Sequence, residues 1–481
     1  MEPLKYINKL KVTIEDLIQN KKYNKALKYI SLCSDLLYHY NQYYCDKDLE
    51  NDIKQISESL LQKSNIKKLD EDVVVFYDGI GADRRGLAYI YVYALTKFKK
   101  VVYVTKEKQK YKIPTISKIL KKNNCIKIFI PDKDNITKIK FVKEVIDTYK
   151  PKNVFMYTVP DDVVITTLFH HYENIITRYQ INLTDHAFWI GASCLDYCIE
   201  FRNYGAYISN NYRFINKDKI VLLPYYPFVD KSIEFEGFPF EFNDIKPKLI
   251  FSGGSLYKTF GGGNKYYLIV DYILQNFKEA IFWYAGAGDC SEFYKLIKKY
   301  PNRIFLTDER KDLYQILKRC YFYLSTYPVC GGLMFQYAAI AGKLPLTLKF
   351  DDCVEGFLIN QDELDIEFEN LEELKEKIRF VFKNEDYIKE QKDIMVKAVI
   401  KPDEFEKELK NLIENQNTNF KITFEYIDIS RFLKVYEENM TYKNLCNIIG
   451  GHKNFWIFPK EVCMKKLFQI RDRFESKLKR G

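Results

Sequence analysis

Short apolar runs alternate with helical patterns along most of this chain, and most of the runs end at a small or polar loop. In the C-terminal half, the runs that predict strands cover residues 249–251, 280–285, 303–306 and 321–325. Helical spacing follows at residues 266–277 and 335–341. Open α/β sheets bind ligands at the loops that follow their strands. The pattern therefore predicts a parallel sheet with a ligand site at these loops.

The same alternation occurs earlier in the chain. Apolar runs there predict strands at residues 73–77, 101–104, 126–130, 154–157, 179–183, 197–201 and 220–223. Helical patterns separate most of them, as expected of a mostly parallel sheet. A chain of 481 residues can hold two such domains with further helices besides.

Helical patterns dominate the two ends of the chain. Residues 1–70 repeat apolar positions at intervals of three and four, with a turn at residues 20–23. This resembles one or two helical-repeat units and predicts an extension that packs on the first domain or binds a protein partner. Residues 402–415 also have a helical pattern, and residues 419–481 predict a tail with a short strand and an amphipathic helix.

The loops of the second domain carry glycines in a specific order. Ser252, Gly253, Gly254 and Ser255 follow the first strand and precede Lys258; a Gly-Ala-Gly turn at residues 286–288 and a Gly-Gly pair at residues 331–332 come later. This order resembles the C-terminal half of the GT-B glycosyltransferases, above all family 4, the glycosyl transferases group 1. Residues 179–186, 195–200 and 219–224 resemble parts of that family's N-terminal half.

The resemblance implies two Rossmann-like parallel-sheet domains that face a cleft. Residues 71–230 would form the acceptor-side domain, 231–248 the connection and 249–401 the domain that binds the nucleotide-sugar donor. In GT-B folds the chain returns to the first domain near its end, and residues 404–415 are the candidate for that return. Residues 1–70 and 402–481 would then be a helical extension and a return helix with its tail.

A nucleotide-sugar donor carries two phosphates, which a protein without a metal neutralises with backbone N–H groups, helix N-termini and basic side chains. The candidates for donor binding are Gly253, Gly254, Ser255, Lys258, Lys265, Gly286, Gly288, Arg310, Gly331, Gly332, Leu333 and Gln336. Each glycine has a second interpretation as a tight turn between a strand and a helix. Arg310 has a second interpretation as a solvated loop charge.

The sequence departs from the family around the Gly-Gly pair. Retaining members of family 4 carry one glutamate before this turn and a second one after it, which binds the ribose hydroxyls. This chain has Val329 and Cys330 before the turn, and Gln336 and Tyr337 after it. An amide such as Gln336 can still hydrogen-bond a hydroxyl, but more weakly than a carboxylate. Both the retaining and the inverting outcome stay open.

Asp185 and His186 are the candidates for the reaction centre because they follow a predicted strand of the first domain. In retaining relatives the histidine contacts the transferred sugar, whereas in an inverting enzyme either residue would accept the proton of the acceptor hydroxyl. Asp78, Gly79, Gly81, Arg84 and Arg85 are the candidates for the acceptor side. A structural βα turn with solvated arginines explains these five residues almost equally well.

Charge, cysteine content and hydropathy limit the ligands and the cellular location that we expect. The net charge of +10 comes from basic residues that interleave with acidic ones, so we expect anionic small molecules or an anionic membrane surface rather than nucleic acid. The 11 cysteines have no zinc-ligand spacing, so we expect no metal, and no cofactor besides the donor. No run of about 18 apolar residues and no signal-peptide core occur. We therefore expect a cytoplasmic location, with contact to the inner face of the cytoplasmic membrane as an option.

The sequence thus predicts a bacterial-type, metal-independent hexosyltransferase that uses a UDP- or GDP-sugar. Its acceptor would be a glycan, a lipid-linked molecule or a protein, in cell-surface polysaccharide or glycoprotein synthesis. The alternative is an inactive GT-B scaffold that assembles with another glycosyltransferase, because the two family carboxylates are missing. A dinucleotide-dependent oxidoreductase ranks low, since the loop from Asp78 lacks the third glycine of the GxGxxG motif.

Overall fold

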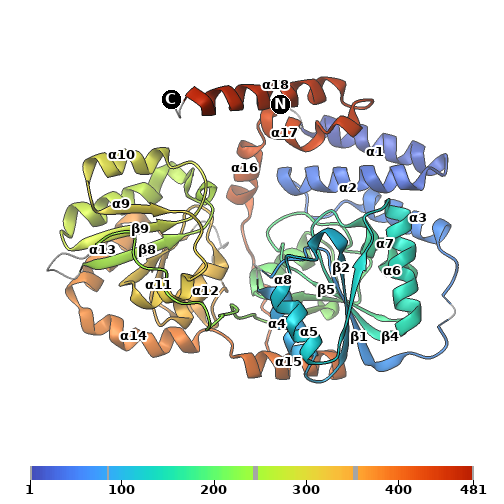
Figure 1. Ribbon diagram of the computed structural model, residues 1–481, viewed down its shortest axis with the longest axis horizontal. Coiled ribbons are helices and arrows are strands. Elements are labelled where there is room, and N and C mark those ends of the chain that lie inside the picture. Colours follow the sequence, from blue (N-terminus) through green and yellow to red (C-terminus); the bar gives the residue numbers. More distant parts are fainter. Residues whose placement is uncertain (1–2, 65, 84–85, 242–246, 350–355, 479–481) are drawn as a thin grey trace. The chain divides into compact units, whose positions relative to one another are not determined.

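The computed structural model describes residues 3–64, 66–83, 86–241, 247–349 and 356–478. The chain divides into two compact units (Figure 1). Unit 1 contains residues 1–200, 205–222 and 408–481, and unit 2 contains residues 201–204 and 223–407. Arg84 and Arg85 lie outside the described residues. Each unit is built on its own parallel sheet.

The sheet of unit 1 has seven parallel strands in the order β3-β2-β1-β4-β5-β6-β7. They are β1 (Asp70–Asp78), β2 (Lys100–Lys106), β3 (Ile126–Ile130), β4 (Pro151–Tyr157), β5 (Thr177–Ile181), β6 (Tyr197–Glu200) and β7 (Ile220–Leu222). Val74 pairs with Val101 on one side and with Asn153 on the other. The strand order reverses between β1 and β4, which is where open α/β sheets form ligand sites.

Helices cover both faces of this sheet because its strands are apolar on both sides. The connecting helices are α4 (Leu87–Leu95), α5 (Pro114–Lys122), α6 (Asn135–Tyr149), α7 (Val163–His171) and α8 (Asn203–Asn211). Val75 and Tyr77 share a core with residues of α6 and α7. Phe76 points to the other face, where its ring lies 6.0 Å from that of Tyr103 and 6.4 Å from that of Phe155.

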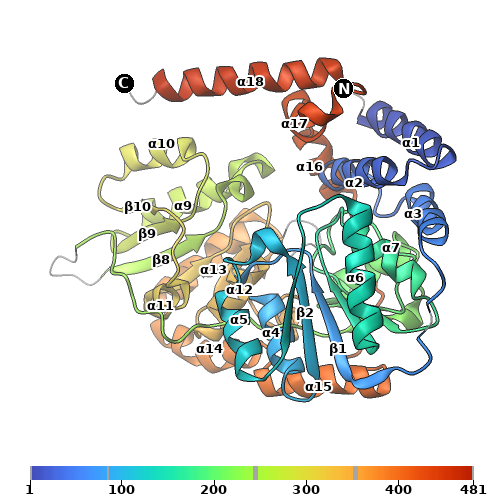
Figure 2. The ribbon, with the colours of Figure 1, turned by 45° about the vertical axis from the view of Figure 1, so that its right-hand side comes forward.

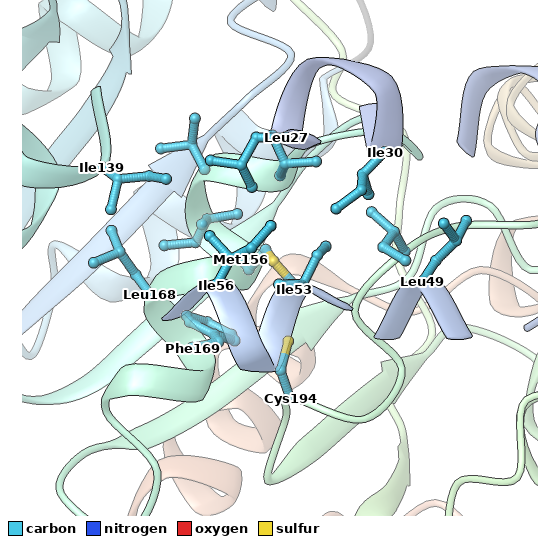
Figure 3. Close-up of a cluster of buried hydrophobic side chains, with 14 of the residues drawn as sticks. Leu27, Ile30, Leu49, Ile53, Ile56, Ile139, Met156, Leu168, Phe169 and Cys194 are labelled. Atoms are coloured by element: carbon cyan, nitrogen blue, oxygen red, sulfur yellow. The ribbon is translucent and has the colours of Figure 1, made fainter. Parts of the chain in front are cut away.

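The N-terminal extension consists of α1 (Pro3–Gln19), α2 (Tyr23–Tyr40) and α3 (Lys47–Leu60). Figure 2 shows α2 and α3 beside α6 and α7, and α1 packs on α2 and α3. Leu27, Ile30 and Ile53 lie in one cluster with Met156 of β4 and Phe169 of α7 (Figure 3). The extension therefore continues the hydrophobic core of unit 1.

The end of the chain also belongs to unit 1. It contains α15 (Pro402–Asn415), which crosses the unit boundary, followed by α16 (Ser430–Asn439), α17 (Tyr442–Ile449) and α18 (Pro459–Leu478). Leu445, Ile449 and Phe458 join the same core as α1 and α2. The Tyr6 hydroxyl donates a hydrogen bond to Glu461 Oε1 at 3.0 Å.

The short strand predicted for the tail is wrong. Within the described part of the tail, up to residue 478, no residue is in a strand. Ile422 and Phe424 do alternate toward the protein, and they pack beside Trp189 and Ile220. Their side chains therefore follow a strand pattern, but their backbone pairs with no strand of the sheet.

Unit 2 has six parallel strands in the order β10-β9-β8-β11-β12-β13. They are β8 (Lys248–Gly253), β9 (Ala280–Ala285), β10 (Ile304–Thr307), β11 (Phe322–Leu324), β12 (Pro345–Leu348) and β13 (Glu367–Phe368). The helices are α9 (Lys265–Asn276), α10 (Ser291–Lys299), α11 (Leu313–Arg319), α12 (Gly332–Ile340), α13 (Leu371–Lys383) and α14 (Glu385–Lys397). The predicted α/β class with two parallel sheets is confirmed.

The segment that enters unit 2 packs on that unit from Leu223 onward. Phe238 and Phe240 place their rings 6.3 Å from Trp283 and 4.8 Å from Phe305. Tyr337 donates a hydrogen bond from its hydroxyl to the Phe228 carbonyl. Much of the stretch interpreted as a connection thus covers the sheet of unit 2.

Candidate functional site

The loops after β8 and β9 of unit 2 contact each other through their backbones. Gly254 N–H donates to the Ala285 carbonyl at 3.0 Å, and Leu256 N–H donates to the Ala287 carbonyl at 2.9 Å. A Cβ on Gly286 would lie 1.8 Å from the Gly254 oxygen, and a Cβ on Gly288 would lie 2.7 Å from the Leu256 Cβ. These two glycines are therefore required by the contact between the loops.

The order of strands in unit 2 reverses between β8 and β11, and the loops that follow these two strands meet. Val329 N–H donates to the Lys258 carbonyl at 3.3 Å. The Lys258 ammonium lies 3.7 Å from the position that a Cβ on Gly331 would occupy. Gly331 is the residue before α12, whose first turn has no side-chain cap. The structure thus brings a basic side chain to the N-terminus of a helix, as an anion site requires.

Three further donor candidates, Lys265, Ser255 and Leu333, lie in or beside the same loops. A Cβ on Gly262 would lie 2.5 Å from the Tyr327 ring, so the loop before α9 packs against the loop after β11. Lys265 begins α9, and its ammonium lies 5.9 Å from the centre of the same ring. Ser255 is exposed on the β8 loop, and Leu333 is half-buried in the first turn of α12. Tyr327, whose ring contacts the loop before α9 and lies near Lys265, is not among the candidates predicted from the sequence.

Arg310 has a structural environment that the sequence did not indicate. Its guanidinium forms an ion pair with Asp312 at 2.7 Å and with Glu236 at 3.2 Å. It also donates to the Gly237 carbonyl at 3.0 Å. Arg310 therefore fastens the segment that enters unit 2 to the loop after β10. A role in donor binding stays a prediction.

Gln336 is buried, with 2% of its surface exposed, and it bridges two backbone segments. Its Nε2 donates to the Tyr225 and Phe357 carbonyls, both at 3.0 Å. Its Oε1 has no hydrogen-bond partner among the described residues. The amide thus keeps one buried acceptor unused, and its contact with a ribose hydroxyl stays a prediction.

Gly332 is required by packing, because a Cβ added at this position would lie 2.3 Å from the Phe357 ring.

In unit 1, Asp185 and His186 lie in the long loop between β5 and β6. Asp185 is almost fully buried, whereas the His186 side chain keeps 36% of its surface exposed. The His186 Nδ1 lies 3.2 Å from Asp185 Oδ1. A carboxylate at this distance favours a proton on Nδ1 and leaves Nε2 free to accept one. The Phe432 ring of α16 lies 6.2 Å from the imidazole, edge to face.

Three polar side chains that sequence reasoning missed hold this loop. Asn41 donates from Nδ2 to the His186 carbonyl at 2.9 Å and accepts from Phe188 N–H at 2.8 Å. Arg213 donates from Nη2 to the carbonyls of residues 184, 185 and 187. The buried carboxylate of Glu50 accepts from the N–H groups of residues 191, 192 and 193. The only local indication of this role is that Glu50 lies among the buried positions of α3, most of which are apolar.

The acceptor-side candidates form a tight turn after β1. The Asp78 carboxylate accepts from Ile80 N–H at 2.9 Å, from Gly81 N–H at 2.7 Å and from the Tyr103 hydroxyl. Burial raises the pKa of Asp78 to about 6. A Cβ on Gly79 would lie 2.3 Å from the Thr158 Oγ1. These contacts show a structural turn, and a role toward the acceptor stays a prediction.

Neither protein-family models nor curated proteins match the sequence. Solved structures do match the fold. HepE of Anabaena, in complex with UDP and glucose, is 9% identical over 72% of this chain and 100% of its own, with a TM-score of 0.53. The same protein in complex with UDP-glucose is 8% identical over 71% of this chain and 99% of its own, with a TM-score of 0.50. A variant of the O-GlcNAc transferase of Thermobaculum terrenum is 11% identical over 90% of this chain and 82% of its own, with a TM-score of 0.51.

These likenesses concern the fold, and membership of family 4 stays a prediction. Within the described ranges, no three His, Cys, Asp or Glu side chains converge in a group that would hold a metal ion. No helix of the described chain combines the length and the apolar character that a bilayer crossing requires. Two parallel-sheet units and these structural neighbours together show that the chain has the GT-B fold.

Proposed function

We propose that this protein is a glycosyltransferase that moves a sugar from a nucleotide-diphosphate sugar to a glycan, a lipid-linked molecule or a protein. The observation that carries the proposal is the position of the Lys258 ammonium beside Gly331, at the N-terminus of α12. It lies at the strand reversal of unit 2, where this kind of sheet binds ligands. UDP is favoured over GDP because HepE, which has the same fold, binds UDP and UDP-glucose.

The diphosphate would sit between Lys258 and the first N–H groups of α12. Those N–H groups have no partner within the helix and carry a partial positive charge. Lys265 borders the same loops and would be a second cation. As the bond between the sugar and the diphosphate breaks, negative charge accumulates on the leaving phosphate, and these groups would stabilise it.

In an inverting reaction, His186 of unit 1 would act as the general base. The acceptor hydroxyl would transfer its proton to Nε2 while its oxygen bonds to the anomeric carbon, and the nucleoside diphosphate would leave with the electron pair of the broken bond. Asp185 would orient the imidazole and stabilise its protonated form, as their 3.2 Å contact favours. In a retaining reaction, His186 would instead contact the transferred sugar.

The proposal is tested by incubating the protein with a panel of UDP- and GDP-sugars and measuring release of free nucleotide. Slow hydrolysis of one donor, at a rate above that of the buffer control, is the expected result, because donor-bound transferases pass the sugar to water when no acceptor is present. A protein that binds a sugar nucleotide, raises its melting temperature accordingly, and yet releases no nucleotide from any donor would contradict catalysis. That result would support an inactive scaffold.

Lys258→Ala should weaken binding of UDP by about 1 to 3 kcal/mol, the usual loss for a charge-assisted hydrogen bond. Calorimetric titration with UDP measures the change, and circular dichroism checks that the fold persists. Lys278→Ala is the matched control, because Lys278 is exposed on the turn before β9, at the opposite edge of the sheet. Equal UDP affinity in the Lys258 variant and the wild type would contradict the assignment and direct attention to Lys265.

Release of nucleotide from the sugar donor should persist in EDTA, because Lys258 and the N-terminus of α12 would supply the positive charge that other transferases obtain from a metal. The donor found in the panel experiment is used with and without the chelator, and release of nucleotide is followed. Loss of activity in EDTA and its return on addition of Mg²⁺ or Mn²⁺ would show instead that a metal carries part of the diphosphate charge.

A further inference from the structure

The last helix of the chain exposes an apolar stripe. In α18, Cys463, Leu467 and Ile470 are spaced by four and three residues, so they lie on one face of the helix. All three are exposed, and Leu467 and Ile470 keep 57% and 50% of their surface accessible. Glu461 and Val462 point in other directions and are buried against unit 1. The stripe therefore faces away from the core.

An exposed aromatic pair precedes the same helix. Trp456 has 93% of its surface accessible and Phe455 has 44%. The other two tryptophans of the chain, Trp189 and Trp283, are buried. A tryptophan is an amphipathic side chain that ordinarily finds cover, and one that remains almost fully exposed beside an apolar stripe suggests a binding surface.

Basic residues surround the apolar ones. Lys466 and Arg471 flank the stripe on opposite sides of the α18 face, and Lys460 precedes it by one turn. Lys453 lies before Trp456, and its carbonyl accepts from the Lys28 ammonium at 3.2 Å. Partial burial, together with repulsion from Lys453 and Lys25, lowers the pKa of Lys28. Positive charge is thus concentrated on this side of unit 1.

Acidic groups do not offset that charge. Between residues 450 and 472 the only acidic residues are Glu461 and Asp472. Glu461 is buried and accepts a hydrogen bond from Tyr6, and Asp472 pairs with Lys443 at 2.8 Å. Over residues 450–472, the exposed face of α18 and the turn before it therefore combine an apolar centre with an almost wholly basic border.

We infer that this surface docks on an anionic lipid bilayer, with α18 lying in the plane of the interface. An amphipathic helix with lysine and arginine beside a leucine and isoleucine stripe binds bilayers by apolar burial together with attraction to anionic headgroups. Trp456 would sit at the headgroup level, where tryptophan is favoured. The lysines alone would suit any polyanion, but an exposed apolar stripe contributes nothing to phosphate contacts on a nucleic acid. The lipid surface uses both halves of the pattern.

The inference is tested with vesicles of phosphatidylcholine alone and of phosphatidylcholine with about one third phosphatidylglycerol. The full-length protein should sediment with the anionic vesicles and not with the neutral ones, and its binding should weaken as salt rises. The tryptophan emission should shift to shorter wavelength on binding, and Trp456→Phe should remove that shift, because Trp189 and Trp283 are already buried.

Two variants separate the charged and apolar contributions. Lys466→Glu combined with Arg471→Glu should weaken vesicle binding by at least about 25-fold, from roughly fivefold per basic residue. Leu467→Asp should weaken it by roughly tenfold or more. Lys110→Glu combined with Tyr111→Ala is the matched control, since Tyr111 is 87% exposed next to lysines on another part of unit 1, and binding should not change.

Several outcomes would overturn the inference. These are equal binding to neutral and anionic vesicles, no binding at physiological salt, or loss of binding in the Lys110/Tyr111 control alone. Retention of the protein by single-stranded nucleic acid without vesicle binding would assign the basic residues to another polyanion. A dimer in solution that Leu467→Asp dissociates, again without vesicle binding, would assign the stripe to a second copy of the chain. None of these readouts depends on sugar transfer.

Discussion

Replacing His186 with alanine is expected to lower turnover by about 100- to 10,000-fold, the usual loss when a positioned proton acceptor is removed. Affinity for the nucleotide should stay unchanged, because the donor candidates belong to unit 2 whereas His186 belongs to unit 1. Asp185→Asn should also lower turnover, since an amide cannot stabilise a protonated imidazole at the 3.2 Å contact. Single-turnover kinetics with the donor found in the panel would separate the chemical step from donor binding.

The chain offers a matched control for this experiment. His39 of α2 also faces an aspartate, with Nδ1 3.3 Å from Asp35 Oδ1, and its side chain is 47% exposed. His39→Ala removes a comparable histidine–aspartate pair from the same unit and should leave turnover intact. Wild-type turnover in both the His186 and Asp185 variants would contradict their catalytic role. A mechanism assisted by the substrate itself would then be the simplest alternative.

Gly286→Ala is expected to have the second large effect, on the stability of unit 2. The added Cβ would lie 1.8 Å from the Gly254 carbonyl oxygen and 2.8 Å from its carbon, so the two loops must separate. Inserting an extra group into a well-packed site typically lowers the free energy of unfolding by about 1 to 3 kcal/mol. Because the neighbour here is backbone and cannot rotate away, we expect a loss of about 3 kcal/mol or more. Thermal unfolding followed by circular dichroism measures the loss, and UDP titration shows whether the shifted loops still bind nucleotide.

Gly263→Ala separates the clash from the backbone preference of glycine. Gly263 has a φ of +69°, and nothing lies within 4 Å of its Cβ position. Gly263→Ala should therefore lower the free energy of unfolding by about 1 to 2 kcal/mol only, which is the cost of holding an alanine in the left-handed backbone conformation. A Gly286 variant as stable as the Gly263 variant would mean that the loops after β8 and β9 separate easily.

The strands that sequence reasoning predicted are those with clear apolar runs between loops. Strand β1 and strand β9 overlap the predicted residues 73–77 and 280–285. Strand β12 begins with Pro345 and contains the polar Thr347, which weakens its strand pattern, and β13 has only two residues, so neither was predicted. The tail strand failed for the opposite reason. Ile422 and Phe424 have the alternation, but pairing depends on a neighbouring backbone that the alternation does not encode.

The candidate site shows the same limit. The order of glycines and Lys258 along the chain was enough to predict loops that the structure places together at the strand reversal of unit 2. The residues that hold the His186 loop could not be found in this way. Asn41 lies 145 residues before His186, and Glu50 lies 141 residues before Gly191. Such contacts depend on tertiary packing and leave only a buried polar side chain as a local signal.

The interleaving of the two units has a consequence for how the protein is made. Residues 223–407 lie within unit 2, whereas unit 1 needs both the start of the chain and residues 408–481. On the ribosome, unit 2 has all of its residues before α16, α17 and α18 emerge. At about 5 to 20 residues per second, the last segment follows after a delay on the order of seconds. During that delay the nascent chain exposes the apolar surface of α1 and α2 that Leu445, Ile449 and Phe458 later cover, and such exposed surface promotes aggregation until the last segment packs on it.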